Sequence, residues 1–191
     1  MTTHRLDDTQ PHAFWDNSYP ARLTVASGDV VVFETLEGTG QIAPESTAEA
    51  LAQFDSELVH PLTGPVYVEG AEPGGVLEVE VLELEHKGWG WNGVLPGFGL
   101  LADEFSEPYL HHYELMGREC LFRPDIRIPF EPFCGVMGVA PARARALRHG
   151  SAARERRQRR HPPPHRGDDC PPPGARRGRA LLVRRLPRGA G

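Results

Sequence analysis

Acidic and imidazole side chains at three positions of this sequence have the types and context for acid–base or metal chemistry. Glu34 ends a Val-rich run, where a carboxylate can act as a general base or bind a metal ion. His60 stands before Pro61 in a turn-rich stretch, where an imidazole can be a metal ligand or a general base. Asp55, a few residues earlier, can orient that ring. Glu34, Asp55 and His60 are therefore the candidate site residues.

Each candidate also has an ordinary structural explanation. A glutamate at a strand end is most often simply solvated, and a loop histidine before proline often bonds a backbone carbonyl and fixes the turn. Spacing alone favours these explanations for Glu34 and His60. Stronger catalytic signatures are missing, because the sequence has no P-loop, no GxSxG and no HExxH.

Other polar residues are interpreted as structural. His12 and Asp16 flank two aromatic residues and could line a pocket, but the preferred interpretation is that the two aromatic rings pack on a sheet. The adjacent His111 and His112 are expected to face different directions. Cys134 has no base beside it in the sequence, so we expect a small buried residue rather than a nucleophile.

The segments that must position these residues have the pattern of strands and turns. The 191 residues are 39% apolar and only 8% aromatic, with 21 Gly and 19 Pro, which argues against a helical bundle. We predict a mainly β fold, as a sandwich or barrel. The expected strands are residues 23–25, 30–34, 65–69, 76–85 and 126–128.

Three local patterns refine this prediction. The strand at 76–85 alternates, except at Val81-Leu82, which indicates a β-bulge. Ser46 to Glu49 has the capping-box pattern and predicts a helix over residues 50–54. The stretch Gly88–Gly99 is rich in glycine and is predicted to be a long surface loop.

Charge divides the chain near residue 142. Residues 1–141 hold 6 basic and 23 acidic side chains, whereas residues 142–191 hold 15 Arg, no Lys and 3 acidic side chains. The only apolar cluster of the second segment is Leu181, Leu182, Val183 and Leu186. We therefore predict a β-rich domain over 1–141 and a disordered Arg/Pro-rich tail over 142–191.

The tail has two interpretations. One is a basic arm that binds nucleic acid, attached to a non-catalytic β-sandwich binding module. The absence of Lys and the Pro triplets at 162–164 and 171–173 argue against it, and we expect no nucleic-acid partner. The other is an out-of-frame translation, because Arg, Pro, Ala and Gly all have GC-rich codons.

Compartment signals are few. No run of eighteen apolar residues is present and the first residues lack the pattern of a secretory signal, so we expect no membrane association. Three cysteines make no disulfide framework. The expected location is the cytoplasm.

Four blocks resemble the acetamidase/formamidase family: FETLEGTGQI (33–42), DSELVHPLTGPVYVEGAEPGGVLEVEVLELE (55–85), PGFGLLADEF (96–105) and PFCGVMGVAP (132–141). The resemblance covers nearly all of residues 10–141. Gly75 stands where the family usually has Asp, and Leu36-Glu37 replaces the common acidic turn after FET.

This resemblance implies hydrolysis of a small amide, formamide or acetamide, to the carboxylic acid and ammonia. It also implies a homo-oligomer and a site that can include a divalent metal such as zinc. On this basis Glu34 would be a base or ligand, His60 a ligand or proton donor, and Asp55 its orienting partner.

The family pattern after GVAP is missing from residues 142–191. The family continues with a GGN-x-D block and a GD-x-HA-x-QG block, and neither is present. Reading the codons one base later permits NGGNVDIRHLTAGTT from residues 155–170 and GDCHAAQ from residues 184–191. We infer a chain that is in frame to about Pro141 and out of frame afterwards, and we expect it to be inactive.

Overall fold

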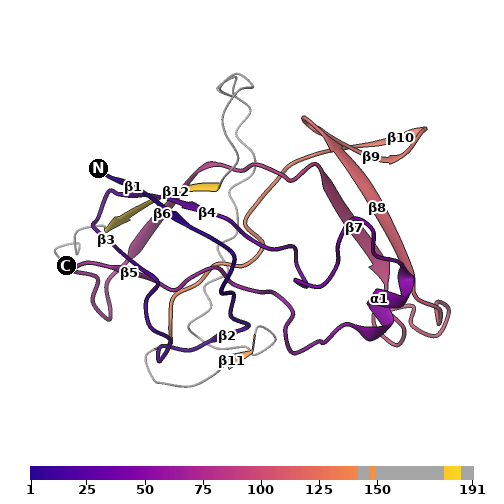
Figure 1. Cartoon of the computed structure of the whole chain (residues 1–191), viewed down its shortest axis with the longest axis horizontal. Coiled ribbons are helices and arrows are strands. Elements are labelled where there is room, and N and C mark those ends of the chain that lie inside the picture. The colour runs from indigo at the N-terminus through magenta and orange to yellow at the C-terminus, as the bar shows by residue number, and fades with distance from the viewer. Residues whose placement is uncertain (142–146, 149–178, 186–191) are drawn as a thin grey trace. The chain divides into compact units, whose positions relative to one another are not determined.

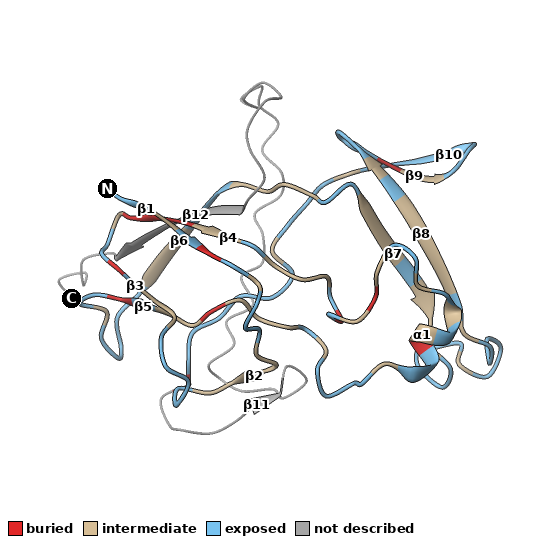
Figure 2. Cartoon of the chain, in the orientation of Figure 1, coloured by how far each residue is buried: buried red, intermediate tan, exposed pale blue. Residues whose placement is uncertain are grey.

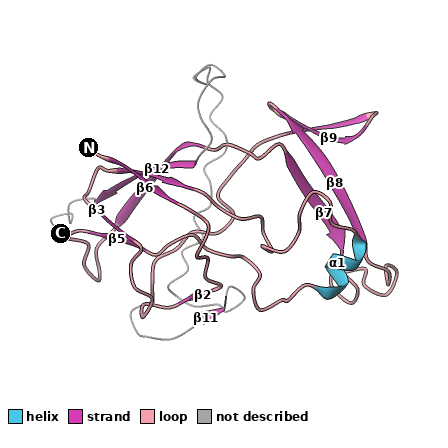
Figure 3. Ribbon diagram, viewed as in Figure 1, coloured by secondary structure: helices cyan, strands magenta, loops and turns pink. Residues whose placement is uncertain are grey.

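The computed structural model describes residues 1–141, 147–148 and 179–185, which form two compact units (Figure 1). The first unit contains residues 1–34, 62–83 and the described residues from 134 onward. The second contains residues 35–61 and 84–133. Strands dominate the described residues and one short helix accompanies them (Figure 3), so the predicted mainly β class is confirmed.

The first unit is built on a four-stranded sheet in the order β1-β4-β12-β6. β1 runs parallel to β4, and β12 runs antiparallel to both β4 and β6. Two smaller ladders join β3 to β5 and β2 to β11. The strand bounds are Thr3–Leu6 (β1), Phe14–Trp15 (β2), Leu23–Val25 (β3), Val30–Phe33 (β4), Val66–Val68 (β5), Leu77–Glu83 (β6), Leu147–Arg148 (β11) and Arg179–Arg185 (β12).

Two of these strands lie in the segment that we expected to be disordered. β12 takes the place between β4 and β6, and β11 pairs with β2. In the structure these two short stretches are strands, and the rest of residues 142–191, where disorder was expected, lies outside the described residues. The sequence analysis noted the apolar cluster at residues 181–183, but it gave the low apolar content of the whole segment more weight than the strand preference of Leu and Val at this place.

Four strands of the first unit share one small apolar core. Leu6, Val25, Val31 and Val68 are buried, one from each of β1, β3, β4 and β5 (Figure 2). Partly buried apolar residues pack around them. Because side chains alternate between the faces of a strand, each short strand supplies only one or two core residues. The short apolar segments at 23–25, 30–34 and 65–69, with turn residues beside them, therefore predicted these strands correctly.

The predicted bulge in β6 is confirmed. β12 pairs Ala180 with Glu83 and then Leu181 with Val81, so the register skips Leu82. The extra residue accounts for the break in alternation at this point of the sequence.

The second unit is an antiparallel sheet in the order β10-β9-β8-β7. Its strands are Trp89–Val94 (β7), Tyr109–Met116 (β8), Glu119–Arg123 (β9) and Ile126–Pro129 (β10). β7 corrects the prediction of a surface loop over residues 88–99. A Cβ atom on Gly93 would lie 2.4 Å from Leu51 Cδ1 and 2.5 Å from Tyr109 O. Glycine is therefore present here for close packing of a strand, not for a flexible loop.

The helix of the second unit is α1, Ala48–Gln53, and it buries Leu51. Its existence was predicted, but its capping was not. Thr47 is the N-cap residue, and its hydroxyl group bonds the side chain of Glu49 instead of a backbone N–H. Ser46 Oγ accepts from Ala43 N in the preceding turn, so the capping-box interpretation is wrong.

A buried carboxylate holds β1 in the first unit. Asp29 is 8% exposed, and its Oδ1 accepts from Thr2 N at 2.7 Å. Its Oδ2 accepts from His4 Nε2 at 3.0 Å and from Ala26 N at 3.2 Å. The hydrogen bond from His4 and those from the two backbone groups lower the pKa of Asp29 to about 2. One side chain thus joins β1 to the turn before β4.

We predict that Asp29→Asn removes part of the acid sensitivity of folding. The depressed pKa means that ionised Asp29 stabilises the fold fully above about pH 4 and that this stabilisation is lost as the pH falls towards 2. Urea midpoints of Asp29→Asn should therefore be lower at neutral pH and should fall less steeply between pH 4 and 2. Asp125→Asn, which changes an exposed ion pair with Arg123, is the control, and its urea midpoint should depend on pH as that of the unmodified chain does. The same pH dependence of the midpoint in Asp29→Asn would contradict the prediction.

Candidate functional site

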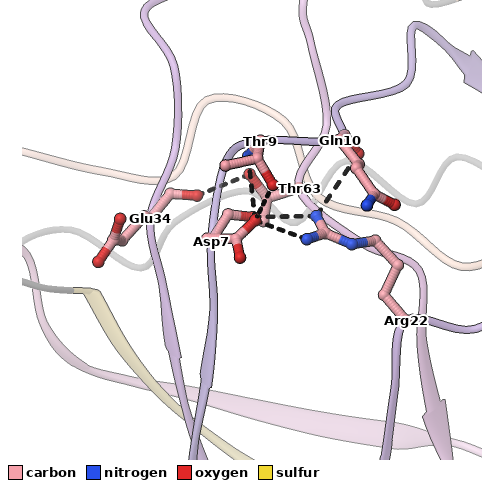
Figure 4. A network of polar contacts seen from close by, with 6 residues as sticks. All are labelled: Asp7, Thr9, Gln10, Arg22, Glu34 and Thr63. Carbon is pink, nitrogen blue, oxygen red and sulfur yellow. Dashed lines mark hydrogen bonds and ion pairs between the residues drawn. The ribbon is translucent and has the colours of Figure 1, made fainter.

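Glu34 belongs to the first unit and directly follows β4. Its backbone is fixed on both sides, because its N–H donates to Leu6 O at 2.8 Å and its carbonyl accepts from Thr63 Oγ1 at 2.7 Å. The carboxylate is exposed and turns away from Thr63 (Figure 4), with Arg5 Nη2 at 3.8 Å. A fixed backbone with an accessible carboxylate suits a base or a ligand, and it equally suits a solvated strand end.

A polar network beside Thr63 holds the turn that leads to His12. Asp7 Oδ1 accepts from Thr9 N at 3.0 Å and from Arg22 Nη2 at 2.6 Å (Figure 4). The Thr9 hydroxyl and Arg22 lower the pKa of Asp7 to about 2, so the carboxylate is ionised. Arg22 Nη1 also donates to Asp7 O at 2.9 Å. These bonds fix the backbone between β1 and β2.

His12 has the properties of a base that its sequence context did not indicate. Its Nδ1 lies 2.9 Å from Phe14 O, and because a carbonyl only accepts, Nδ1 carries the proton and Nε2 the lone pair. Burial lowers the pKa of His12, so the ring is neutral at pH 7. A Cβ atom added to Gly64 would lie 3.9 Å from Nε2. The centroids of the His12 and Tyr19 rings are 5.0 Å apart. The sequence analysis allowed a pocket-lining role for His12 but preferred packing of its aromatic neighbours.

Long-range pairing brings His12 to the HPLTGP stretch. His12 and Leu62 exchange backbone hydrogen bonds of 3.1 and 2.8 Å. The two residues are far apart in the sequence, so no local pattern could have joined them. In the first unit, His12, Thr63 and Glu34 thus share a framework that is fixed by backbone and hydroxyl contacts.

Asp55 and His60 belong to the second unit, and each is exposed. Asp55 Oδ1 accepts from Glu57 N at 2.8 Å, which forms a local turn. His60 N donates to Gly38 O at 2.8 Å. The orienting role of Asp55 towards His60 remains a prediction.

His60 has an unusual backbone conformation. Its φ is 61°, and it is the only residue other than glycine with positive φ in the part of the chain that the structure describes. A side chain in this left-handed region carries a conformational cost that glycine avoids. Strain of this kind concentrates at functional positions. The strained backbone of His60 therefore supports it as a site residue more strongly than its sequence context did.

The expected divalent metal is not tested by the described residues. Among residues 1–141 and the two short stretches beyond, no group of three or more His, Cys, Asp or Glu side chains could hold an ion. Glu34 belongs to one unit, and Asp55 and His60 belong to the other. Binding of a divalent metal such as zinc therefore remains a prediction.

The remaining polar candidates are structural. His111 Nε2 donates to Phe122 O at 2.7 Å, and His112 Nε2 donates to Ser46 O at 2.8 Å, so the two neighbours bind different segments as expected. Asp16 Oδ1 accepts from Ser18 N. Cys134 is only partly buried, unlike our expectation, whereas Cys120 is buried and burial raises its pKa.

Comparison with known proteins identifies the family of this chain. The sequence profile of the Acetamidase/Formamidase family matches residues 2–175. The chain belongs to the acetamidase/formamidase family. It is 32% identical to an acetamidase of Mycolicibacterium smegmatis over 147 residues, and 31% identical to a formamidase of Methylophilus methylotrophus over 137 residues. These matches include 69% and 68% of this chain but 36% and 33% of the relatives.

Solved structures of acetamidase/formamidase relatives share the fold. An acetamidase of Bacillus halodurans superposes with a TM-score of 0.70 at 31% identity, over 77% of this chain and 49% of that protein. A gamma lactamase of Delftia acidovorans gives 0.59 at 30% identity, over 64% and 32%. The chain thus spans about a third of the length of the curated relatives it matches. No helix among the described residues has the length and apolar character to cross a bilayer.

We predict that His60→Gly is more stable than His60→Ala by about 1 kcal/mol, because alanine keeps the left-handed strain and glycine relieves it. Urea unfolding of both variants measures the difference. The control pair, Glu45→Gly and Glu45→Ala, should show the opposite order, since Glu45 has negative φ. Equal stability of the two His60 variants would show that the position is unstrained.

Proposed function

We propose that this chain is part of an amide hydrolase that converts formamide or acetamide to the carboxylic acid and ammonia, and that by itself it is inactive. The family match over residues 2–175 carries the proposal. The relatives named acetamidase and formamidase support the substrate class. The gamma lactamase supports cleavage of an amide C–N bond in a more general sense.

Hydrolysis of a linear amide needs three groups. A base takes a proton from water, whose oxygen then bonds to the carbonyl carbon; a donor stabilises the carbonyl oxygen; and an acid protonates the nitrogen as the C–N bond breaks. Glu34 is our candidate for the base, His60 for the acid, and Asp55 for its orienting partner. His12 is a second candidate base, since its pKa is lowered and its Nε2 carries a lone pair.

Two observations support an incomplete site. The GGN-x-D and GD-x-HA-x-QG blocks of the family are absent as written and are permitted one reading frame away. Many large apolar side chains of the described residues are exposed, and the PGFGLL stretch is the clearest case, with Leu100 fully exposed and Phe98 77% exposed. Apolar surface of this kind is expected where part of a domain is missing.

We predict that the purified chain releases no ammonia from formamide or acetamide above the uncatalysed background. The reason is that the blocks that would complete the site are replaced by Arg and Pro. Restoring the reading frame after codon 141 by one base should produce activity, which a coupled ammonia assay measures. Turnover by the unrepaired chain near the typical enzymatic value of about 10 per second would refute inactivity. Absence of the two blocks from the shifted frame of the DNA would refute the frame shift.

The alternative of a basic nucleic-acid-binding arm predicts a different result. We expect no binding of a labelled DNA duplex at about 150 mM salt, and no difference when Arg154, Arg156, Arg157, Arg159 and Arg160 are changed to Gln. Fluorescence anisotropy measures binding. Substitution is the sharper design than deletion, because removing residues 142–191 would also remove β12 from its sheet. Salt-dependent binding that the five substitutions abolish would favour the arm.

A further inference from the structure

Glu37 is the most heavily hydrogen-bonded carboxylate among the described residues. Its Oε1 accepts from Gln41 N at 2.8 Å, from Ile42 N at 3.0 Å and from the Thr39 hydroxyl. Its Oε2 accepts from Thr39 N at 2.9 Å and from Trp91 Nε1 at 2.9 Å. Five donors from one short loop and from β7 therefore converge on a single side chain.

These contacts require a charged carboxylate. Burial alone would raise the pKa of Glu37, but the hydrogen bonds from Thr39, Ile42 and Trp91 outweigh it, and the pKa is lowered. A glutamine has one acceptor oxygen and would direct an N–H₂ group at some of the same donors. Several N–H groups of the loop would then lose their partner, which is costly in a partly buried position.

The loop that Glu37 organises, residues 37–42, contacts both site candidates of the second unit. The side chain of Gln41 clamps the backbone of Asp55: Nε2 donates to Asp55 O at 3.0 Å, and Oε1 accepts from Asp55 N at 2.7 Å. Gly38 O accepts from His60 N at 2.8 Å. A Cβ atom on Gly40 would lie 3.1 Å from the Pro61 ring, so the loop also packs closely against the next residue.

We infer that Glu37 is a positioning residue for Asp55 and His60, and this inference rests on the proposed function of these two residues. Glu37 fixes the loop, Gln41 and Gly38 then fix the backbone of the two candidates, and Trp91 attaches the whole arrangement to the sheet. Glu37 stands in the FETLEGTGQI block as the acidic residue after the strand, so the Leu-Glu variation noted in the sequence keeps a carboxylate at this place.

The test is amide hydrogen exchange of the full chain by NMR, which needs no enzymatic activity. In Glu37→Gln, exchange of the Asp55 and His60 amides should accelerate about tenfold or more, and the Trp91 indole and Gln41 side-chain signals should shift. Glu37→Asp keeps the charge and should recover part of the protection. Amides of the β8–β9 ladder report global stability and should change much less. Glu119→Gln, which breaks an exposed ion pair with Arg127 in the same unit, should leave the Asp55 and His60 amides unchanged.

Thr39→Val is the milder variant, since it removes only the hydroxyl donor, and it should accelerate the same two amides a few-fold. Unchanged Asp55 and His60 exchange in both Glu37→Gln and Thr39→Val would overturn the inference. Equal acceleration of all amides, with no recovery in Glu37→Asp, would also overturn it, because Glu37 would then serve general stability alone. Failure of the ammonia assay in the frame-restored chain would instead refute the proposed function, so the two failures are distinguishable.

Discussion

Carboxylates that accept several hydrogen bonds from loops are the interaction on which this structure depends. The strands are short, so a large share of backbone N–H groups lies outside the ladders and must find other acceptors. Asp29 serves the start of β1, Asp7 serves the turn after it, and Glu37 serves the loop after β4. Each has a lowered pKa for the same reason: the charged form is the better acceptor. Part of the acidic excess of residues 1–141 is thus structural.

Local sequence patterns predicted the elements whose determinants are local. β3, β5 and β10 follow alternation and β4 is a short apolar run, each with turn residues nearby, and the bulge in β6 was visible as a break in alternation. β7 was not predicted, because its glycines look like loop residues until the close approach of Leu51 and Tyr109 is known. β12 was not predicted, because the composition of its whole segment outweighed a short apolar cluster that itself favours a strand. Tertiary packing overrides local propensity at β7.

The candidate site was likewise predictable only in part. Glu34 and His60 were identifiable from residue type and context. The structural features that support them as site residues could not be predicted locally: the hydrogen bond from the Thr63 hydroxyl to the Glu34 carbonyl, and the positive φ of His60. The role of His12 depends on its pairing with Leu62, and the role of Glu37 on a tryptophan more than fifty residues away. Such contacts join residues that are distant in the sequence, so they cannot be predicted from local patterns of a single sequence.

Family membership and catalytic competence place different demands on a chain. The backbone signatures that place this chain in the family, FETLEGTGQI and HPLTGP, consist largely of residues that organise loops, and the described structure gives them that role through Glu37, Gln41 and Thr63. Loop organisation needs only the residues within each unit. Amide hydrolysis needs groups that converge on one substrate, and about half of a solved family member has no counterpart in this chain. Folding of each unit into the family's architecture is therefore a separate requirement from assembly of the groups that amide hydrolysis needs.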